Sequence, residues 1–436
     1  MNAKKLKSKI KEIQTLYKSD DRPWIIGYSG GKDSTCVLQL VYMALSKLDS
    51  KELHKKVWVI CGDTLVEIPT VVERIDTTFD NLNKSAQKAN IPLQGVKVYP
   101  EVNDTFFVNL IGKGYPAPTR TFRWCTERLK IDPASEFIKT QVSTYGEAII
   151  ILGARKDESM SRAQTLEKYS REGELLKKHG TLPSAYVYAP IEDWLLKDVW
   201  TFLGNFPCPW GDDNKDLVMM YQKAGGDECP LVIDTSTPSC GNSRFGCWVC
   251  TVVEQDKSIQ GFIENGETWL EPMANFRNMI LKMREDRENH RLVDESRIGG
   301  YGPFKPESRE LILKELFLVE KSMFEKYQKR VIRFEELLSI QKIWDRKNLK
   351  NSKGKRLSIK RLWNDVYNKN EKSPIKDIDE EMLLAEFCKK NDVPYDMIKN
   401  MIIDERDLSK YSRRKNIFIR LDKHLDDQLK QSHADS

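Results

Sequence analysis

Apolar and polar residues alternate along the chain with two different periods. Near the N-terminus the period is that of one helix face, with apolar residues at Leu6, Ile10, Ile13 and Tyr17. Farther on come short apolar runs, separated by helical stretches, at residues 24–28, 57–60, 96–99 and 148–152. Strands that alternate with helices predict an α/β domain with a mainly parallel sheet and helices on both faces.

The pattern changes after residue 206. Residues 208–266 are rich in Cys, Pro and Gly and lack a regular period, which predicts a loop-built module held by a metal. A helical face resumes at Phe276, Met279, Ile280 and Met283, and residues 309–338 predict one long helix. The remainder predicts helices with a basic break at 341–361. We therefore expect three parts, at residues 1–206, 207–300 and 301–436.

The composition is that of a soluble globular protein. The chain has 436 residues, of which 40% are hydrophobic and 31% are charged. No apolar run approaches the ~20 residues of a membrane span, and the N-terminus lacks the apolar core of a signal peptide. We expect a cytoplasmic protein without a membrane partner. Nine cysteines, an odd number, favour metal binding or catalysis over a disulfide framework.

Positive charge is concentrated in the C-terminal third. The net charge is +6, but residues 301–436 alone carry +7. Residues 341–361 contain nine basic residues and one acidic residue, between Trp344 and Trp363. Such a run can neutralise several phosphates, or it can be a solvated surface. The sequence leaves both interpretations open.

A glycine loop follows the first predicted strand. It reads Ser29, Gly30, Gly31, Lys32, Asp33, Ser34 and Thr35, and it opens a helix. Two glycines let the backbone approach an anion, and the helix N-terminus adds free N–H groups and partial positive charge. The loop is not a Walker A motif, because that motif needs glycine where Ile26 stands. This pattern is typical of pyrophosphate binding.

The string SGGKDS resembles the fingerprint of the PP-loop ATP pyrophosphatases. The resemblance implies an adenine-nucleotide alpha-hydrolase-like fold and ATP cleavage between the α- and β-phosphates. It also implies that Asp33 takes part in Mg²⁺ binding and that the loop amides hold pyrophosphate. We count Asp63 and Gly153, which each follow a predicted strand, among the expected ATP-binding residues.

Two further strings carry cations and a thiol. Residues 121–130 place Cys125 among Arg123, Arg128 and Lys130, and residues 153–159 contain Arg155, with Arg162 shortly after. Guanidinium groups bind phosphate or sulfate in a bidentate way, although each arginine taken singly can also be a surface ion pair. Together with PIEDW at 190–194, these strings resemble the phosphoadenosine phosphosulfate reductase branch. The resemblance covers about residues 20–205.

One departure from that branch is informative. Those reductases carry a C-terminal catalytic cysteine in an ECG-type motif, and this chain has none. Its last cysteine, Cys388, lies in a helical pattern that predicts a core position. The departure disfavours sulfonucleotide reduction.

Four cysteines crowd into 22 residues and predict a metal site. They are Cys229, Cys240, Cys247 and Cys250, of which the last two form a C-x-x-C pair. Four thiolates can hold Zn²⁺ or a [4Fe–4S] cluster, and a single C-x-x-C pair favours the cluster over zinc. A module without metal is the remaining alternative. Cys208 and Cys125 are substitute ligand candidates, and Cys125 is alternatively a free thiol that carries sulfur.

The combination of the glycine loop, RWCT, GARKDES and CGNSRFGCWVC resembles the DndC family of DNA phosphorothioation proteins. The resemblance implies replacement of a non-bridging oxygen of the DNA backbone by sulfur. The sulfur comes from a cysteine desulfurase, and other proteins of the DNA sulfur-modification system are required. ATP adenylates the phosphate oxygen, and a persulfide sulfur displaces AMP. Asp33, Arg155, Arg162 and Cys125 are then the catalytic residues.

Three other functions stay open at this point. A tRNA thiolation enzyme uses the same kind of loop and cluster to activate a base carbonyl oxygen. A sulfonucleotide reductase is the second, and a nucleotide-sensing subunit that no longer turns over ATP is the third. The intact glycine loop disfavours the sensor.

Overall fold

A computed structural model describes residues 3–158, 175–224, 246–294, 296, 300–367, 384–385, 387–389 and 393–409. Two compact units make up the chain. The first comprises Met1–Val319 and Val331–Leu357, and the second comprises Glu320–Arg330 and Ser358–Ser436. The expected domain boundaries near residues 206 and 300 stay a prediction.

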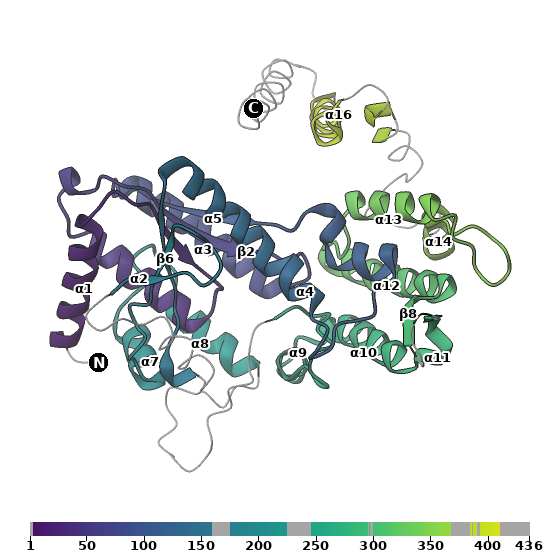
Figure 1. Ribbon diagram of the computed structural model, residues 1–436, viewed down its shortest axis with the longest axis horizontal. Helices are drawn as coiled ribbons and strands as arrows, with labels where there is room; N and C mark the ends of the chain where they lie inside the picture. Colours follow the sequence, from purple (N-terminus) through teal and green to yellow (C-terminus); the bar gives the residue numbers. More distant parts are fainter. Residues whose placement is uncertain are drawn as a thin grey trace, which may run out of the picture. The chain divides into compact units, whose positions relative to one another are not determined.

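A six-stranded sheet forms the centre of the N-terminal half (Figure 1). Its strands are β1 (Trp24–Gly27), β2 (Val57–Gly62), β3 (Leu93–Val98), β4 (Ala148–Ile151), β5 (Lys177–Lys178) and β6 (Ala185–Tyr188). The order is β3-β2-β1-β4-β6-β5, and all neighbours are parallel except β5 and β6. The four apolar runs therefore mark strands as predicted. The last two strands were missed, because β5 is short and polar and β6 is only half-buried.

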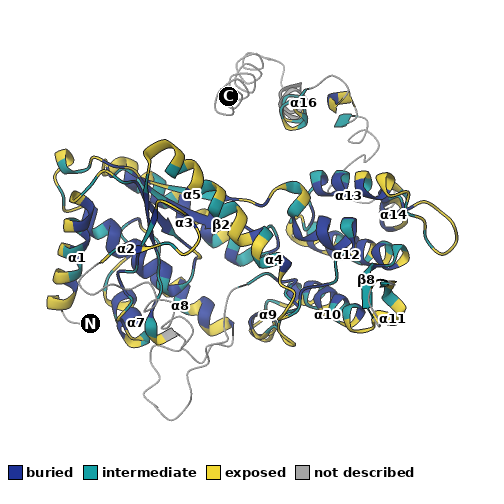
Figure 2. Ribbon diagram, in the orientation of Figure 1, coloured by how far each residue is buried: buried dark blue, intermediate teal, exposed yellow. Residues whose placement is uncertain are grey.

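Helices cover both faces of this sheet, as the strand pattern predicted. Alternate residues of β1 point to opposite faces. Trp24 meets Tyr17 of the first helix edge to face, with ring centroids 5.1 Å apart. Ile25 instead joins Ile138 of α5 in an apolar cluster on the other face. Both side chains are fully buried, which is typical of a parallel strand covered on two sides. Figure 2 shows the arrows of the sheet largely in the colour of buried residues.

The helices of this half follow the sequence closely. They are α1 (Ala3–Lys18), α2 (Lys32–Leu45), α3 (Pro69–Lys88), α4 (Trp124–Thr126), α5 (Asp132–Tyr145), α7 (Leu196–Asn205) and α8 (Asn214–Lys223). The predicted face of α1 is buried, with Tyr17 fully enclosed. The prediction of an irregular segment over 208–266 was wrong for two helices. The helix α8 buries Leu217, Met220 and Tyr221, and a second helix at Lys257–Glu264 buries Ile259 and Phe262.

The second half of the first unit is helical, with one small hairpin. Its elements are α9 (Lys257–Glu264), α10 (Glu271–Glu285), α11 (Arg287–His290), β7 (Arg291–Asp294), β8 (Gly300–Phe304), α12 (Pro306–Tyr327) and α13 (Phe334–Arg346). The residues of α12 from Glu320 onward belong to the second unit. The predicted face of α10 is confirmed at Phe276, Ile280 and Met283. The single helix predicted over 309–338 was wrong. Gln328 adopts a left-handed conformation with φ +55°, which ends α12 and separates it from α13.

Buried hydrogen bonds anchor these helices to the π-helical segment Val108–Lys113 of the N-terminal half. Arg309 of α12 is 2% exposed and donates to the carbonyl oxygens of Phe304 at 2.8 Å and Gly112 at 3.0 Å. Trp344 of α13 donates to the carbonyl of Ile111 at 3.1 Å. The helical part thus belongs to the same compact unit as the sheet.

The second unit contains α14 (Ile359–Val366) and α16 (Tyr395–Ser409). Trp363 stacks on Tyr367 with ring centroids 4.3 Å apart. Cys388 is 2% exposed, so its predicted core position is confirmed. Across the described residues, none of the helices combines the length and the apolarity that a bilayer crossing requires.

We expect Arg309→Met to lower the free energy of unfolding by about 2–4 kcal/mol, because two buried carbonyl groups lose their donors. Denaturant unfolding followed by tryptophan fluorescence measures the change. Arg346→Met removes the same group from an exposed position and should change stability by less than about 0.5 kcal/mol. Equal effects of the two substitutions would contradict the anchoring role of Arg309.

Candidate functional site

The glycine loop lies where the order of the sheet changes direction. From β1 the chain proceeds outward through β2 and β3, and it then returns to β4 on the other side of β1. The loops after β1 and β4 therefore leave the same edge of the sheet as neighbours. Open α/β sheets bind their ligands in the crevice at such a point.

The loop is held in shape by its own side chains and by α3. Gly30 has φ +74°, and its carbonyl accepts a hydrogen bond from Arg74 at 2.7 Å. Ser34 Oγ donates to the Gly31 carbonyl at 3.0 Å and accepts from the Ser29 amide at 3.2 Å. Gly31 is the N-cap residue of α2, and no side chain caps the first amides of this helix. This arrangement directs the first amides of the helix toward the loop, as an anion site requires.

Asp33 faces two cations from different elements. Its Oδ1 atom lies 2.6 Å from Nε of Arg155, and its Oδ2 atom lies 3.7 Å from Nζ of Lys32. Arg155 is 3% exposed and also contacts Asp157 at 3.1 Å. The structure thus brings three of the predicted site residues together. Phosphate oxygens can replace the carboxylate as a partner of this guanidinium.

Gly153 gives the loop after β4 its close approach to α2. A Cβ atom built on Gly153 would lie 2.8 Å from the carbonyl carbon and oxygen of Asp33, and 2.9 Å from the amide nitrogen of Ser34. Real Cβ atoms do not approach backbone this closely. Only glycine therefore fits between the two loops, which explains the position of Gly153 in the predicted site.

Tyr221 of α8 completes the loop, and no motif in the sequence pointed to it. Its hydroxyl accepts a hydrogen bond from the Lys32 amide at 3.2 Å, across 189 residues of chain. The Lys32 ammonium lies 5.1 Å from the centre of the same ring. Trp200 of α7 fixes the ring from the side, with centroids 5.3 Å apart. A tyrosine hydroxyl thus partners an amide that a phosphate oxygen can also bind.

Asp63 lies at the carboxyl end of β2, as predicted. Its Oδ1 atom accepts from the Leu65 amide at 2.9 Å, and its Oδ2 atom lies 3.2 Å from Nζ of Lys97. Lys97 pairs with Asp76 as well. The sequence did not single out Lys97, since a lysine near the end of β3 carries no motif. Asp63 is thus held in place at the edge that carries the glycine loop.

The C-x-x-C segment lies against the chain that follows β2. Cys247 forms an antiparallel bridge with Glu67, and the Trp248 amide donates to the Val66 carbonyl at 2.9 Å. The Cys250 amide donates to the Cys247 carbonyl at 3.0 Å, which closes the turn between the paired thiols. The thiols therefore lie beside a segment that begins at the carboxyl edge of the sheet.

Cys125 is an electrostatic neighbour of this pair. Burial raises the pKa of the Cys125 thiol, and the Cys250 thiol raises it further. The pKa of Lys130 is raised. The Cys247 thiol is the largest influence and raises it, whereas burial lowers it. Burial raises the pKa of Cys247 as well, and Glu67 adds to that shift. The structure thus gathers Cys125, Cys247 and Cys250 around one lysine.

The other predicted ligands are not part of this group. Cys208 is buried beside Asp212 and Gln39, and burial raises its pKa to about 12. Cys229, Cys240 and Arg162 lie outside the described residues. Thiol donors suit iron or zinc. Within the described ranges, however, no three His, Cys, Asp or Glu side chains are placed to hold a metal ion.

Two arginines of α10 fix the backbone after the C-x-x-C pair. Arg277 donates to the carbonyl of Cys250 at 2.8 Å, and Arg284 donates to the carbonyls of Thr251 at 2.7 Å and Pro118 at 2.6 Å. Thr251 Oγ1 also donates to Pro118 at 2.8 Å. These bonds tie the cysteine segment to the loop that leads to Cys125.

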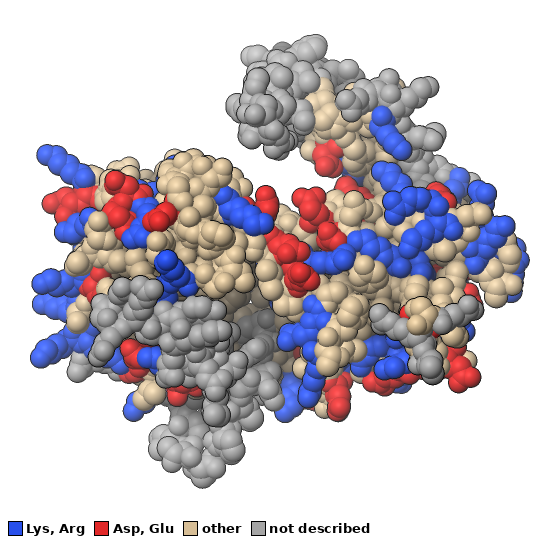
Figure 3. Space-filling view, in the orientation of Figure 1, with Lys and Arg blue, Asp and Glu red and all other residues tan. Residues whose placement is uncertain are grey.

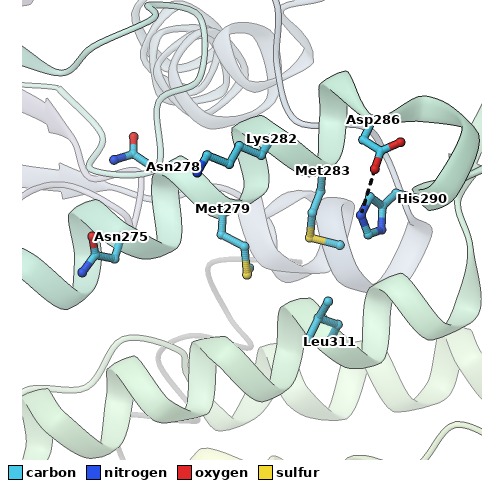
Figure 4. Close-up of a pocket in the computed structure, with 8 residues that line it drawn as sticks. All are labelled: Asn275, Asn278, Met279, Lys282, Met283, Asp286, His290 and Leu311. Atoms are coloured by element: carbon cyan, nitrogen blue, oxygen red, sulfur yellow. Dashed lines mark ion pairs between the residues drawn. The ribbon is translucent and has the colours of Figure 1, made fainter.

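Two pockets lie on other elements. One of about 510 Å³ lies between α10 and α12 (Figure 4), and its lining residues are Asn275, Asn278, Met279, Lys282, Met283, Asp286, His290 and Leu311. The other, of about 440 Å³, lies between α1 and residues 190–194. Neither is lined by the glycine loop or the cysteines, so neither coincides with the predicted chemistry.

Comparison with known proteins places the nucleotide half in a family. The model of the phosphoadenosine phosphosulfate reductase domain matches residues 23–253, which is more than half of the chain. The chain belongs to this family. This match confirms the coarser part of the resemblance, to the phosphoadenosine phosphosulfate reductase branch.

Two relatives come from Methanocaldococcus jannaschii. Uncharacterized protein MJ0066 is 25% identical over 64% of this chain and 45% of its own length. Uncharacterized protein MJ0973 is 28% identical over 46% of this chain and 40% of its own length. The chain thus spans less than half of the length of either relative.

Solved structures of several enzymes are similar at low identity. The phosphoadenylyl-sulfate reductase of Candida auris, in a phosphate complex, is 14% identical with a TM-score of 0.30, and the match covers 50% of this chain and 92% of that chain. The U34-tRNA thiolase NcsA of Methanococcus maripaludis, with its [4Fe-4S] cluster, is 13% identical with a TM-score of 0.31. That match covers 64% of this chain and 79% of NcsA.

We expect Gly153→Ala to weaken ATP binding at least tenfold, because the added Cβ displaces the backbone at Asp33 and Ser34. Titration calorimetry with ATP measures the effect. Gly204→Ala is the matched control, since a Cβ at Gly204 meets nothing within 4 Å. Tight binding by the Gly153 variant would show that the two loops do not form the nucleotide site.

Proposed function

We propose that this protein uses ATP to activate a DNA backbone phosphate for replacement of a non-bridging oxygen by sulfur. One observation carries the proposal. The C-x-x-C segment pairs with the chain directly after β2, through Cys247 and Glu67, and the glycine loop follows the neighbouring strand β1. A site for thiol chemistry thus adjoins a site for phosphate chemistry at one edge of the sheet.

The first step is adenylation. A non-bridging oxygen of the DNA phosphate attacks the α-phosphorus of ATP, the bond to the β-phosphate breaks, and pyrophosphate leaves. The amides at the start of α2 bind the pyrophosphate, and Asp33 would hold Mg²⁺, which would neutralise phosphate charge there. Arg155, beside Asp33, stabilises the added negative charge. The oxygen becomes part of AMP, which is a good leaving group.

The second step transfers sulfur. The terminal sulfur of a persulfide, made by a cysteine desulfurase, attacks the activated phosphorus and AMP leaves. This gives a mixed phosphoryl disulfide. A second thiol then attacks the carrier sulfur, so that a protein disulfide forms and the phosphorothioate is released with the electron pair. Cys125, Cys247 and Cys250 are the thiols nearest this chemistry among the described residues.

A [4Fe–4S] cluster fits the proposal through its donor set. Cys229, Cys240, Cys247 and Cys250 would hold it, with Cys125 as the substitute ligand that the structure brings beside Cys250. When bound, such a cluster supplies iron that binds sulfur. Zinc at the same thiols is the alternative.

The burial of Cys388, the last cysteine of the chain, disfavours sulfonucleotide reduction. A catalytic thiol that attacks a sulfonucleotide must reach solvent, and Cys388 is 2% exposed. Thiolation of tRNA stays as the alternative, with a base carbonyl oxygen in place of the DNA phosphate.

We expect the anaerobically purified protein to contain iron and to show the visible absorption of an iron–sulfur cluster. The Cys247→Ala variant should lose both the iron and the absorption. Cys208→Ala is the control, because Cys208 is buried elsewhere in the same unit and should leave the iron content unchanged. Zinc in place of iron would support the alternative metal. A metal-free protein would remove the cluster from the proposal.

Radioactive sulfur labelling of cells that carry the gene and its genomic neighbours tests the function itself. We expect label in purified DNA, and we expect Asp33→Ala to abolish it, since the variant loses the carboxylate of the glycine loop. DNA and tRNA are purified separately. Label that disappears from tRNA instead would establish tRNA thiolation. If neither pool depends on Asp33, ATP-to-pyrophosphate exchange is measured with the partner proteins and nucleic acid present. Exchange would indicate an enzyme with another substrate, and its absence would favour an inactive sensor.

A further inference from the structure

The basic run that the sequence singled out forms an ordered hairpin after α13. Lys350 and Arg356 face each other in an antiparallel bridge, and the Leu357 amide donates to the Leu349 carbonyl at 3.1 Å. At the tip, Gly354 adopts φ +73°, and its amide donates to the Asn351 carbonyl at 2.9 Å. The chain from 349 to 357 is therefore a closed turn. We call these residues the basic hairpin.

One asparagine holds the tip of the basic hairpin in place. The side-chain oxygen of Asn351 accepts from the amides of Lys353 and Lys355, each at 3.1 Å. Its side-chain nitrogen donates to Glu310 of α12 at 2.9 Å. The Leu349 amide donates to the carbonyl of Trp344, which is itself buried. The backbone that carries the lysines is thus fixed before any partner arrives, which lowers the entropy cost of binding.

The cations on this surface are not neutralised by the protein. The residues concerned are exposed and have no ion-pair partner in the described part of the chain; they are Lys342, Arg346, Lys347, Lys350, Lys353 and Lys355. The nearby acid, Asp345, accepts a hydrogen bond from Gln341 at 2.9 Å. Figure 3 shows Lys and Arg side chains gathered around α13 and the chain that follows it.

The charges of this surface repel one another. The pKa of Lys347 is lowered, first by its partial burial and then by the positive charges of Arg309, Arg346 and Lys113. A surface salt bridge would have the opposite effect on a lysine. In the described part of the chain, no carboxylate is among the groups that shift the pKa of Lys347.

We propose that the basic hairpin and the C-terminal end of α13 bind the phosphate backbone of duplex DNA. This inference rests on the proposed function, which makes DNA the substrate. Several fixed cations on one projecting turn suit a polyanion whose charges repeat along an axis, whereas a single small anion would use one or two of them. The basic hairpin belongs to the same compact unit as the glycine loop.

The scaffold explains how binding here serves the reaction. Ser339 of α13 donates to Asn103 at 2.8 Å, and Trp344 donates to Ile111 at 3.1 Å, so α13 is anchored to the nucleotide half. DNA held at the basic hairpin keeps a fixed relation to the glycine loop. The hairpin acts as a positioning element and takes no part in the chemistry.

Fluorescence anisotropy with a labelled 30-base-pair duplex tests this inference on the full chain. Affinity is measured over a series of salt concentrations for the wild type and for the triple variant Lys350→Gln, Lys353→Gln and Lys355→Gln. Each lost phosphate contact makes the slope of log K against log salt shallower by about 0.9. We expect a slope shallower by about 2–3 and an affinity lower by about 10–100-fold at moderate salt.

A control variant separates a local effect from a loss of net charge. Lys4→Gln, Lys7→Gln and Lys11→Gln remove three exposed cations from α1. This control should leave the slope and the affinity close to those of the wild type. Equal losses in the two triple variants would overturn the inference, and so would an unchanged slope in the hairpin variant. Asn351→Ala keeps every charge and should weaken binding through loss of preorganisation alone, with an unchanged slope.

The readouts distinguish this inference from the proposed function. ATP binding without DNA, measured by titration calorimetry, should be unchanged in the hairpin variant, which also shows that the variant is folded. If sulfur enters DNA in cells but the hairpin variant binds the duplex normally, the inference fails and the function stands. If the hairpin variant loses DNA binding but no sulfur enters DNA in cells, the proposed function is wrong and the DNA-binding role of the basic hairpin is supported. Preferential binding of tRNA over the duplex would overturn the inference in favour of RNA.

Discussion

The close contact between the loop after β4 and the start of α2 is the constraint on which the site depends. Gly153 lies where a Cβ would overlap the backbone of Asp33. Because the loops touch there, Arg155 is within 2.6 Å of the Asp33 carboxylate and both flank the uncapped amides of α2. The strand order produces this contact, since β1 and β4 are parallel neighbours. If another strand lay between β1 and β4, Arg155 would be too far from Asp33 to contact it.

The rest of the first unit is built onto the same edge. The bridge between Cys247 and Glu67 brings the thiols to the chain after β2, and Arg277 and Arg284 hold the backbone that follows them. Arg309 and Trp344 then fix the helical half to the segment 108–113. Each attachment is a hydrogen bond to a backbone carbonyl, which is insensitive to the side chain on the accepting residue. The glycine loop, the C-x-x-C segment and the basic hairpin thus belong to one compact unit.

Sequence reasoning succeeded where a local pattern has a local cause. The period of the N-terminal helix, the four buried strands and the glycine loop all follow from residues within a few positions of one another. It failed at residues 309–338, where a left-handed Gln328 ends the helix without any change in the apolar pattern. It also failed at α8, because a ten-residue helix among Cys, Pro and Gly gives a weak period.

The sequence by itself determined the α/β class, the PP-loop and the supply of thiols and cations, since each is written in contiguous residues. Only the tertiary structure decided that Tyr221 partners the Lys32 amide, that the C-x-x-C segment lies against the chain after β2, and that the basic run closes into a hairpin on α12. These contacts join residues far apart along the chain. Their partners are chosen by strand order and by the packing of whole helices, which no local pattern of hydrophobic and polar residues encodes.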